Sequence, residues 1–206
     1  MAVRLLLAAG ALPGHSLAQQ HPGPVELDRA RPQEARAARD TAAADLIAAK
    51  RQLNRGFEAL AVSADERSLF LAFQSPLAHP DVAAHRHARH VRLWALDTAT
   101  EQVTAQYLYP LDLPSSFLRD SAAGDFDRAD VKISELTVLG RSLLLVLERG
   151  SLTTKLYLVD LESGPSLEPR HLDPETRPTI EQLSAADALD LPVLAKTLIF
   201  STDDFP

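Results

Sequence analysis

From Gly56 onward, short apolar or half-apolar runs alternate with short polar turns, which is typical of strands in an antiparallel sheet. The runs fall into two groups of four, and a four-stranded antiparallel meander is the unit of a propeller blade. The pattern therefore predicts an all-β fold, a partial β-propeller of about two four-stranded antiparallel blades. The expected strands are Phe57–Ser63, Ser68–Gln74, Val91–Asp97, Gln102–Tyr109, Ile133–Val138, Ser142–Glu148, Lys155–Leu161 and Ala195–Phe200.

The two groups also resemble each other in sequence. Arg67–Leu71 (RSLFL) aligns with Arg141–Leu145 (RSLLL), and Arg92–Asp97 (RLWALD) aligns with Lys155–Asp160 (KLYLVD). Each third strand ends in an aspartate, which starts a turn by hydrogen bonding to its own backbone. Coincidence between two ordinary hairpins is the alternative, but the matched segments occur in the same order and favour an internal repeat.

The first quarter of the chain lacks this alternation. Residues 1–20 combine Arg4, a short apolar stretch and small residues near Ala18, which predicts a signal peptide; a misplaced start or an Ala/Leu-rich tail is the alternative. Residues 21–53 are expected to form a Pro-rich linker, up to Pro32, followed by an Ala-rich helix from Gln33. Residues 54–206 then form the β domain.

Three long connections interrupt the strands. They are Pro76–His90, Asp112–Asp130 and Pro165–Pro192. Long structured loops in a repeat fold usually gather at a binding face, so we expect specificity to reside there.

Composition narrows the classes of function. The 206 residues contain 21 Lys and Arg against 28 Asp and Glu, a net charge of −7, which argues against a nucleic-acid partner. The chain has no cysteine, so it has neither disulfides nor thiolate metal sites. No apolar run approaches the ~20 residues of a membrane span. The motifs of serine esterases, Gly-rich nucleotide sites and H-E-x-x-H metalloproteases are absent.

Two glutamates are candidate metal ligands. Glu58 and Glu135 open the first strand of each group, and first strands line the central channel of a propeller. Convergent carboxylates suit Ca²⁺, which takes ~6–8 oxygen ligands. The alternative is that both are polar strand ends, solvated or capping a turn.

Other polar residues are candidates for substrate or anion binding. Gln74 and Glu148 end the second strand of each group and correspond to one another. Arg86, Arg89 and Arg92 carry guanidinium groups that match phosphate oxygens. They lie in and after the run HRHARH, which contains His85, His87 and His90. His85 and His87 would share one face of an extended segment and could hold a metal, although the interleaved arginines favour a solvated basic loop.

Several of these segments resemble the phytase-like domain family, described as having esterase-like activity. The resemblance is carried by Asn54–Ser63 (NRGFEALAVS), Gln74–Leu77 (QSPL), Tyr107–Leu111 (YLYPL), Ile133–Leu136 (ISEL), Leu147–Arg149 (LER), Lys155–Leu161 (KLYLVDL) and Lys196–Leu198 (KTL). One departure is Ala59, which stands where the family usually has glycine after the glutamate.

The resemblance implies a propeller-like fold and an exported, periplasmic or secreted, hydrolase of phosphoric or other esters. The calcium ion that Glu58 and Glu135 are expected to hold would assist this hydrolysis. Closed propellers need at least ~4 blades and only two are expected here, so the chain is predicted to be a truncated member. The alternative is a non-catalytic binding or scaffold module, or an inactive truncated fragment, that self-associates through open sheet edges.

Overall fold

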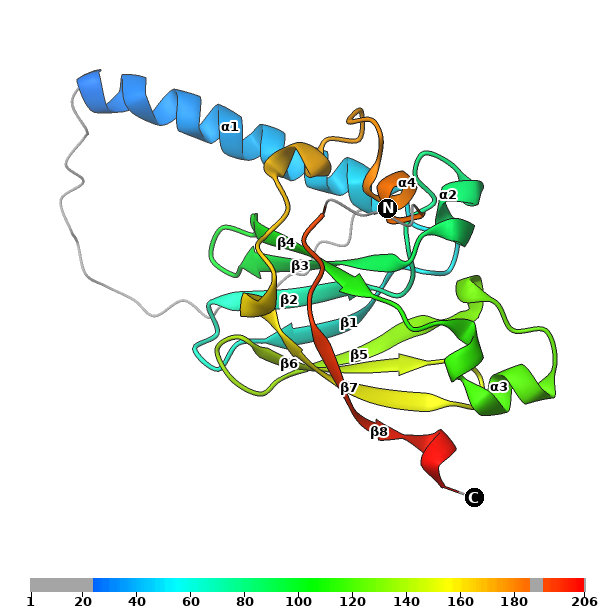
Figure 1. Ribbon diagram of the computed structural model, residues 1–206. Coiled ribbons are helices and arrows are strands. Elements are labelled where there is room, and N and C mark those ends of the chain that lie inside the picture. Colours follow the sequence, from blue (N-terminus) through cyan, green and yellow to red (C-terminus); the bar gives the residue numbers. More distant parts are fainter. Residues whose placement is uncertain (1–23, 186–190, 206) are drawn as a thin grey trace. The chain divides into compact units, whose positions relative to one another are not determined.

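The computed structural model describes residues 24–185 and 191–205 (Figure 1). The predicted signal peptide therefore lies outside the described residues. The chain divides into two units, residues 1–35 and residues 36–206, and the second contains both sheets. The helix α1 (Pro24–Ala48) begins in the first unit and ends in the second.

Residues 36–206 contain two four-stranded antiparallel sheets, each a simple meander (Figure 1). Sheet A has the order β1-β2-β3-β4 and sheet B the order β5-β6-β7-β8. All eight expected strands and their grouping into fours are thereby confirmed. The strands are β1 (Phe57–Val62), β2 (Ser68–Phe73), β3 (His90–Asp97), β4 (Val103–Pro110), β5 (Lys132–Val138), β6 (Leu143–Arg149), β7 (Thr154–Asp160) and β8 (Lys196–Ser201).

The aspartates that end the third strands start turns, as their sequence predicts. The Asp97 carboxylate accepts hydrogen bonds from the backbone N–H groups of Ala99 (3.0 Å) and Thr100 (2.8 Å). The Asp160 carboxylate accepts one from Glu162 N–H at 2.9 Å. In both sheets the aspartate side chain accepts hydrogen bonds from the backbone N–H groups that follow the strand, which no longer pair with a neighbouring strand.

A single hydrophobic cluster joins the two sheets, because β1 and β5 lie side by side and both contribute to it. In sheet A an aromatic group anchors the cluster: the ring centroids of Phe57 and Phe73 are 4.1 Å apart, and Trp94 packs edge-on to Phe73 at 5.2 Å. The last turns of α1 add Ala44 and Ile47, both buried.

The helix begins earlier and ends earlier than expected. It starts at Pro24 rather than Gln33 and ends at Ala48 rather than Leu53. Proline is favoured in the first turn of a helix, where its missing N–H has no intrahelical partner, so Pro24 is compatible with a helix start. Pro32 lies inside the helix and does not end it.

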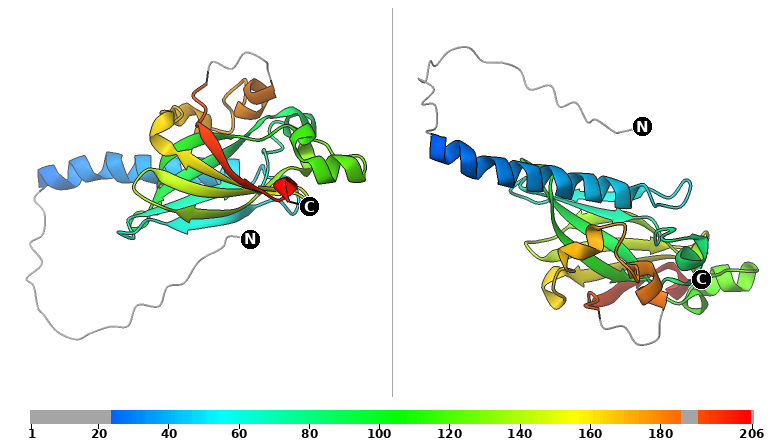
Figure 2. Two further views of the ribbon diagram at one scale, coloured as in Figure 1. Left: turned by 60° about the horizontal axis from the view of Figure 1, so that its bottom comes forward. Right: turned by 90° about the horizontal axis from the view of Figure 1, so that it is seen from above.

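The three long connections contain short helices and meet one another. They hold α2 (Val82–His87), then α3 (Leu118–Ala123) and a 3₁₀ turn at Arg128–Asp130, and finally α4 (Ile180–Ala185). The helix α2 contacts both α4 and the Arg128–Asp130 turn, and α2 and α4 lie together in Figures 1 and 2. The expectation that these connections gather is thus confirmed. None of the helices in the described ranges is both long and apolar enough to cross a membrane.

The far face of sheet B is apolar but only half-covered. Leu145 and Leu147 of β6 lie on it with Leu156 and Leu158 of β7, and all four are of intermediate exposure. The edge strand β8 is the most exposed strand: Leu198, Ile199 and Phe200 are 48%, 56% and 37% exposed.

A buried aspartate fastens the connection between the sheets to sheet B. The Asp120 carboxylate in α3 accepts hydrogen bonds from the backbone N–H groups of Ser151, Leu152 and Thr153, at 2.7–2.9 Å. These three donors lie in the β6–β7 turn, which begins at Gly150. The carboxylate fits against Gly150 because that residue has no side chain: a Cβ there would lie 2.5 Å from Asp120 Oδ2.

We therefore expect Gly150→Ala to destabilise the protein by about 1–3 kcal/mol, since the added methyl group must displace Asp120 from its three donors. Urea denaturation monitored by circular dichroism measures this loss. Gly140→Ala is the matched control, because a Cβ at Gly140 meets nothing within 4 Å, and its free energy of unfolding should stay close to the wild-type value. Equal effects of the two substitutions would contradict this account of Asp120.

Candidate functional site

Most of the residues predicted to carry function lie toward one end of the two sheets. In a meander, the first residues of odd-numbered strands and the last residues of even-numbered strands share an end. Glu58 and Arg92 lie near the start of β1 and β3, Gln74 directly follows β2, and Glu148 is the second-last residue of β6. Glu135 lies instead in the middle of β5. The first two long connections leave from this end as well.

The segment before β1 forms a groove of about 550 Å³ at this end. It is lined by Ala49, Arg51, Gln52, Leu53, Asn54, Arg55, Gly56 and Glu58. Its size lies within the range of small-molecule sites, ~300–1,000 Å³. Asn54 adopts a left-handed conformation (φ 59°), which turns the chain into β1. The exposed carboxylate of Glu58 is the acidic group on the groove wall.

Ala59, which replaces the glycine usual in the family, fits without backbone strain. It is fully buried, and it is not among the described non-glycine residues with positive φ, which are Asn54, Glu66 and Glu101. The β-bulge between Phe57 and Ala59 sets the direction of Glu58 instead.

The backbone of Gln74 lies at the seam between the sheets, and Glu135 lies on β5, the strand beside β1. Gln74 N–H donates to Gly56 O, and Gln74 O accepts from Ile133 N–H, both at 2.9 Å, so the backbone of Gln74 connects β1 with β5. Glu135 is exposed and accepts a hydrogen bond from Leu136 N–H at 3.0 Å.

The acidic and histidine side chains of the described residues are too dispersed to form a metal site. Within the described ranges, no three His, Cys, Asp or Glu side chains come together in a way that could hold a metal ion. Glu58 and Glu135 alone would supply fewer oxygen atoms than the ~6–8 that Ca²⁺ takes. The described residues therefore do not form a complete calcium site.

Glu148 lies at the centre of a buried charge network between the sheets. Its carboxylate is fully buried and accepts hydrogen bonds from Tyr109 Oη (2.7 Å), from Asp112 N–H (2.8 Å) and from Lys196 Nζ (2.7 Å). Tyr109 is the second-last residue of β4 and Lys196 begins β8, so the network joins sheet A to the edge strand of sheet B.

The second half of the network surrounds Asp112, two residues after the end of β4. Lys196 Nζ lies 2.8 Å from one carboxylate oxygen of Asp112, and Lys155 Nζ lies 2.7 Å from the other. Tyr157 donates a hydrogen bond to the Lys155-side oxygen. Lys196 also lies over the Tyr157 ring, 4.0 Å from its centroid, which adds a cation–π contact. Two lysines thus balance two carboxylates.

The pKa values of Glu148 and Asp112 are shifted in opposite directions. Burial raises the pKa of Glu148, and Lys196 opposes this shift. Burial would also raise the pKa of Asp112, but the hydrogen bonds from Lys155, Lys196 and Tyr157 outweigh it, and the pKa of Asp112 lies well below the ordinary value. Asp112 is therefore held ionised, while the ionised form of Glu148 depends on Lys196.

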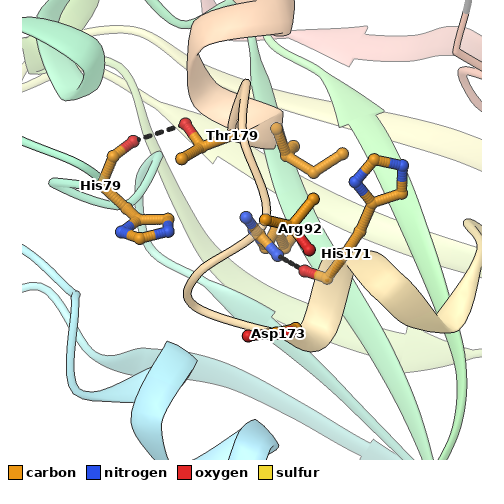
Figure 3. Close-up of a pocket in the computed structure, with 7 residues that line it drawn as sticks. His79, Arg92, His171, Asp173 and Thr179 are labelled. Atoms are coloured by element: carbon orange, nitrogen blue, oxygen red, sulfur yellow. Dashed lines mark hydrogen bonds between the residues drawn. The ribbon is translucent and has the colours of Figure 1, made fainter.

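The structure places Arg92 away from solvent, between β3 and the third long connection (Figure 3). Its guanidinium donates to both carboxylate oxygens of Glu181 (2.8 and 2.9 Å), to Gln106 Oε1 (3.0 Å) and to His171 O (2.7 Å). Nearby, Thr179 Oγ1 donates to His79 O at 2.8 Å. The space among these side chains does not admit a water molecule, so Arg92 fastens the connection to sheet A.

The histidine-rich run forms a short helix rather than the expected loop. His85 is buried in α2, and its Nδ1 lies 2.6 Å from Pro76 O, whereas Arg86 and His87 are exposed. His90 begins β3, and its Nδ1 lies 2.9 Å from Ser184 Oγ. Burial, together with Arg89, Arg128 and Lys196, lowers the pKa of His90 to about 4. Ser184 Oγ also accepts from the backbone N–H of Arg89, at 2.8 Å.

The sequence predicts a role for Glu148 but not for its partners Asp112, Lys155 and Lys196. The pairing across the sheets joins positions far apart in the chain, and no local pattern indicates it. The one available signal was that Lys155 and Lys196 stand in segments that resemble the phytase-like family.

The chain matches a known family over nearly its whole length. Residues 13–205 match the Phytase-like family, which is described as "Esterase-like activity of phytase". No curated protein and no solved structure gives a significant match.

We expect Lys196→Met to lower the free energy of unfolding by about 3–5 kcal/mol at pH 8, since it leaves the buried Glu148 without its cation. A buried carboxylate with a raised pKa binds its proton more tightly folded than unfolded, so stability falls as pH rises above the unfolded value near 4.5. The loss should therefore be larger at pH 8 than at pH 5 in urea denaturation.

The double variant Lys196→Met/Glu148→Gln is the control. Removing the stranded charge should recover part of the stability and flatten the pH dependence. A loss that is independent of pH and unchanged in the double variant would contradict the assigned charge pair.

Proposed function

The chain belongs to the Phytase-like family, and from this membership we propose that it is an exported hydrolase of phosphoric or other esters. The observation that carries the proposal is the match over residues 13–205, which includes the groove, the charge network and both sheets. Export to the periplasm or the medium is proposed from residues 1–20 alone.

The groove before β1 is the proposed place of reaction. Ester hydrolysis needs a group that takes a proton from the attacking water and positive charge near the oxygen atoms that become more negative. Glu58 is exposed on the groove wall and can accept the proton, while Arg51 and Arg55 supply positive charge beside it. The water oxygen then bonds to phosphorus or to the acyl carbon, and the ester oxygen leaves with a proton.

The charge network around Glu148 has a positioning role in this proposal. Glu148 is fully buried, so it acts on the site through the elements that it joins and not by contact with substrate. Within the predicted anion-binding set, Arg86 is exposed and can contact a substrate, whereas Arg92 is engaged by Glu181 and Gln74 bridges strands. Arg89 lies two residues after the end of α2 and is partly exposed.

Calcium is a separate proposal. Glu58 and Glu135 would supply carboxylates to the ion, and further oxygen atoms would come from water or substrate. Because the described residues do not complete such a site, no step above depends on the ion.

We also propose that the two sheets are neighbouring blades of a propeller. The contact between their first strands, β1 and β5, supports this arrangement, since first strands meet around the axis of a propeller.

The proposal predicts turnover of p-nitrophenyl phosphate or p-nitrophenyl butyrate, and loss of about 10²-fold or more in kcat/KM in Glu58→Gln. Glu162→Gln, at an exposed carboxylate outside the groove, is the matched control and should keep wild-type activity. Assays with added Ca²⁺ and with a chelator test the calcium proposal, in which Glu135→Gln weakens the response to the ion. Absence of turnover on both esters under all these conditions would overturn the proposed hydrolysis.

A non-catalytic scaffold that binds a second copy of itself is the second candidate. The observation in its favour is the open edge strand β8, with exposed Leu198, Ile199 and Phe200.

This candidate predicts dimers or larger species by light scattering. Substituting Ile199→Lys should shift the population to monomer, because a charge on an open edge opposes strand pairing. Thr197→Lys, an exposed position on the same strand, reports whether charge anywhere on β8 suffices. A monodisperse wild-type monomer would count against the scaffold.

A further inference from the structure

Three positively charged side chains crowd together where β5 and β6 approach the segment before β1. Lys132 and Arg149 lie directly opposite each other on the β5–β6 ladder. Arg55 lies near both, close enough for its charge to act on each of them. Like charges directly opposite on neighbouring strands destabilise a sheet, so this arrangement has a cost that the fold alone does not explain.

The described protein does not neutralise these charges by ion pairs. Lys132 forms no ion pair with a described residue, and Arg55 Nη1 is buried without a hydrogen-bond partner in that part of the chain. Arg149 donates from Nε to Ser134 Oγ (2.9 Å) and from Nη1 to Gly150 O (3.1 Å), both neutral acceptors. An unpaired buried donor carries a desolvation cost that a ligand could offset.

Two nearby carboxylates, those of Asp127 and Asp130, accept hydrogen bonds from backbone N–H groups of their own turn. Asp127 accepts a hydrogen bond from Ala129 N–H at 2.7 Å, and Asp130 accepts one from Asp127 N–H at 3.0 Å, which together cap the 3₁₀ turn. They moderate the positive charge without pairing with it. Burial lowers the pKa of Lys132, and Arg55 and Arg149 lower it further, in keeping with mutual repulsion.

Arg55 connects this cluster with the groove of about 550 Å³ that also contains Glu58. We propose that Arg55, Lys132 and Arg149 bind the phosphate group of an anionic ester beside that groove. Guanidinium groups present paired N–H donors that match phosphate oxygens, and Lys132 adds a point charge. The inference rests on the proposed function, whose substrate class it narrows to phosphoric esters rather than neutral ones.

The test measures binding of inorganic phosphate to the full chain, not turnover. In dilute buffer, phosphate should raise the midpoint of thermal unfolding of the wild type by about 2–4 °C relative to chloride or acetate at equal ionic strength. The rise should disappear in Lys132→Gln and in Arg55→Gln. Arg141→Gln removes an exposed arginine from the β5–β6 turn, at the other end of the same hairpin, and should keep the full rise.

The variants also separate a ligand site from a structural cluster. Without phosphate, Lys132→Gln should unfold at the same or a higher temperature than the wild type, because it relieves repulsion. A lower midpoint than that of Arg141→Gln would mean that Lys132 supports the fold, and would overturn the proposal. Equal effects of phosphate, chloride and acetate on the wild type would overturn it as well.

Failure of this proposal differs from failure of the proposed hydrolysis. If the protein binds phosphate through Lys132 and Arg55 but cleaves no ester, the proposed phosphate site stands and the proposed hydrolysis is wrong. If the protein cleaves esters but phosphate stabilises Lys132→Gln as much as the wild type, the proposed hydrolysis stands and the proposed phosphate site is wrong.

Discussion

The carboxylate of Glu148 is fully buried, so hydrogen-bond donors and a positive charge must lie beside it. The arrangement of both sheets depends on the elements that supply these donors. The hydrogen bonds to this carboxylate come from β4, from Asp112 in the connection that follows β4, and from β8. Breaking any one of them leaves charge or a polar group without a partner in a dry interior, so these elements are stable only together. The hydrophobic cluster brings the sheets into contact, and the network then fixes which side chains face one another.

The strands could be predicted from the sequence because their cause is local. Alternating apolar positions and turn-forming residues such as Asp97 and Asp160 specify where a strand runs and ends, and the meander follows from short connections. The placement of Glu58, Gln74 and Glu148 toward one end was predictable for the same reason. The pairing of Lys196 with Glu148 and Asp112 was not, since it joins residues far apart in sequence across two sheets. Arg92 shows the same limit: its partner Glu181 lies in a connection whose path no local pattern reveals.

The groove, the cationic cluster and the charge network around Glu148 are three separate features that lie near one another. The groove contains the exposed Glu58, the cluster of Arg55, Lys132 and Arg149 adjoins it, and Arg149 follows the network residue Glu148 in β6. The buried network around Glu148, in which lysines pair with carboxylates, therefore lies beside a cationic cluster that forms no ion pairs with the described residues. Such a contrast is expected where a scaffold is rigid and its ligand supplies the missing charge.

The long connection between β7 and β8 has a consequence for how the protein folds. β8 can pair with β7 only after residues 161–195 have closed into a loop, and closing a long loop costs entropy before any contact compensates for it. The Arg92–Glu181 pair fastens that connection to sheet A, and the Thr179–His79 hydrogen bond fastens it to the connection that follows β2. These contacts shorten the stretch of chain that is free to move before β8, and they lower the entropy cost of bringing Lys196 to Glu148. The place of β8 in sheet B therefore depends on contacts that its preceding connection makes outside sheet B.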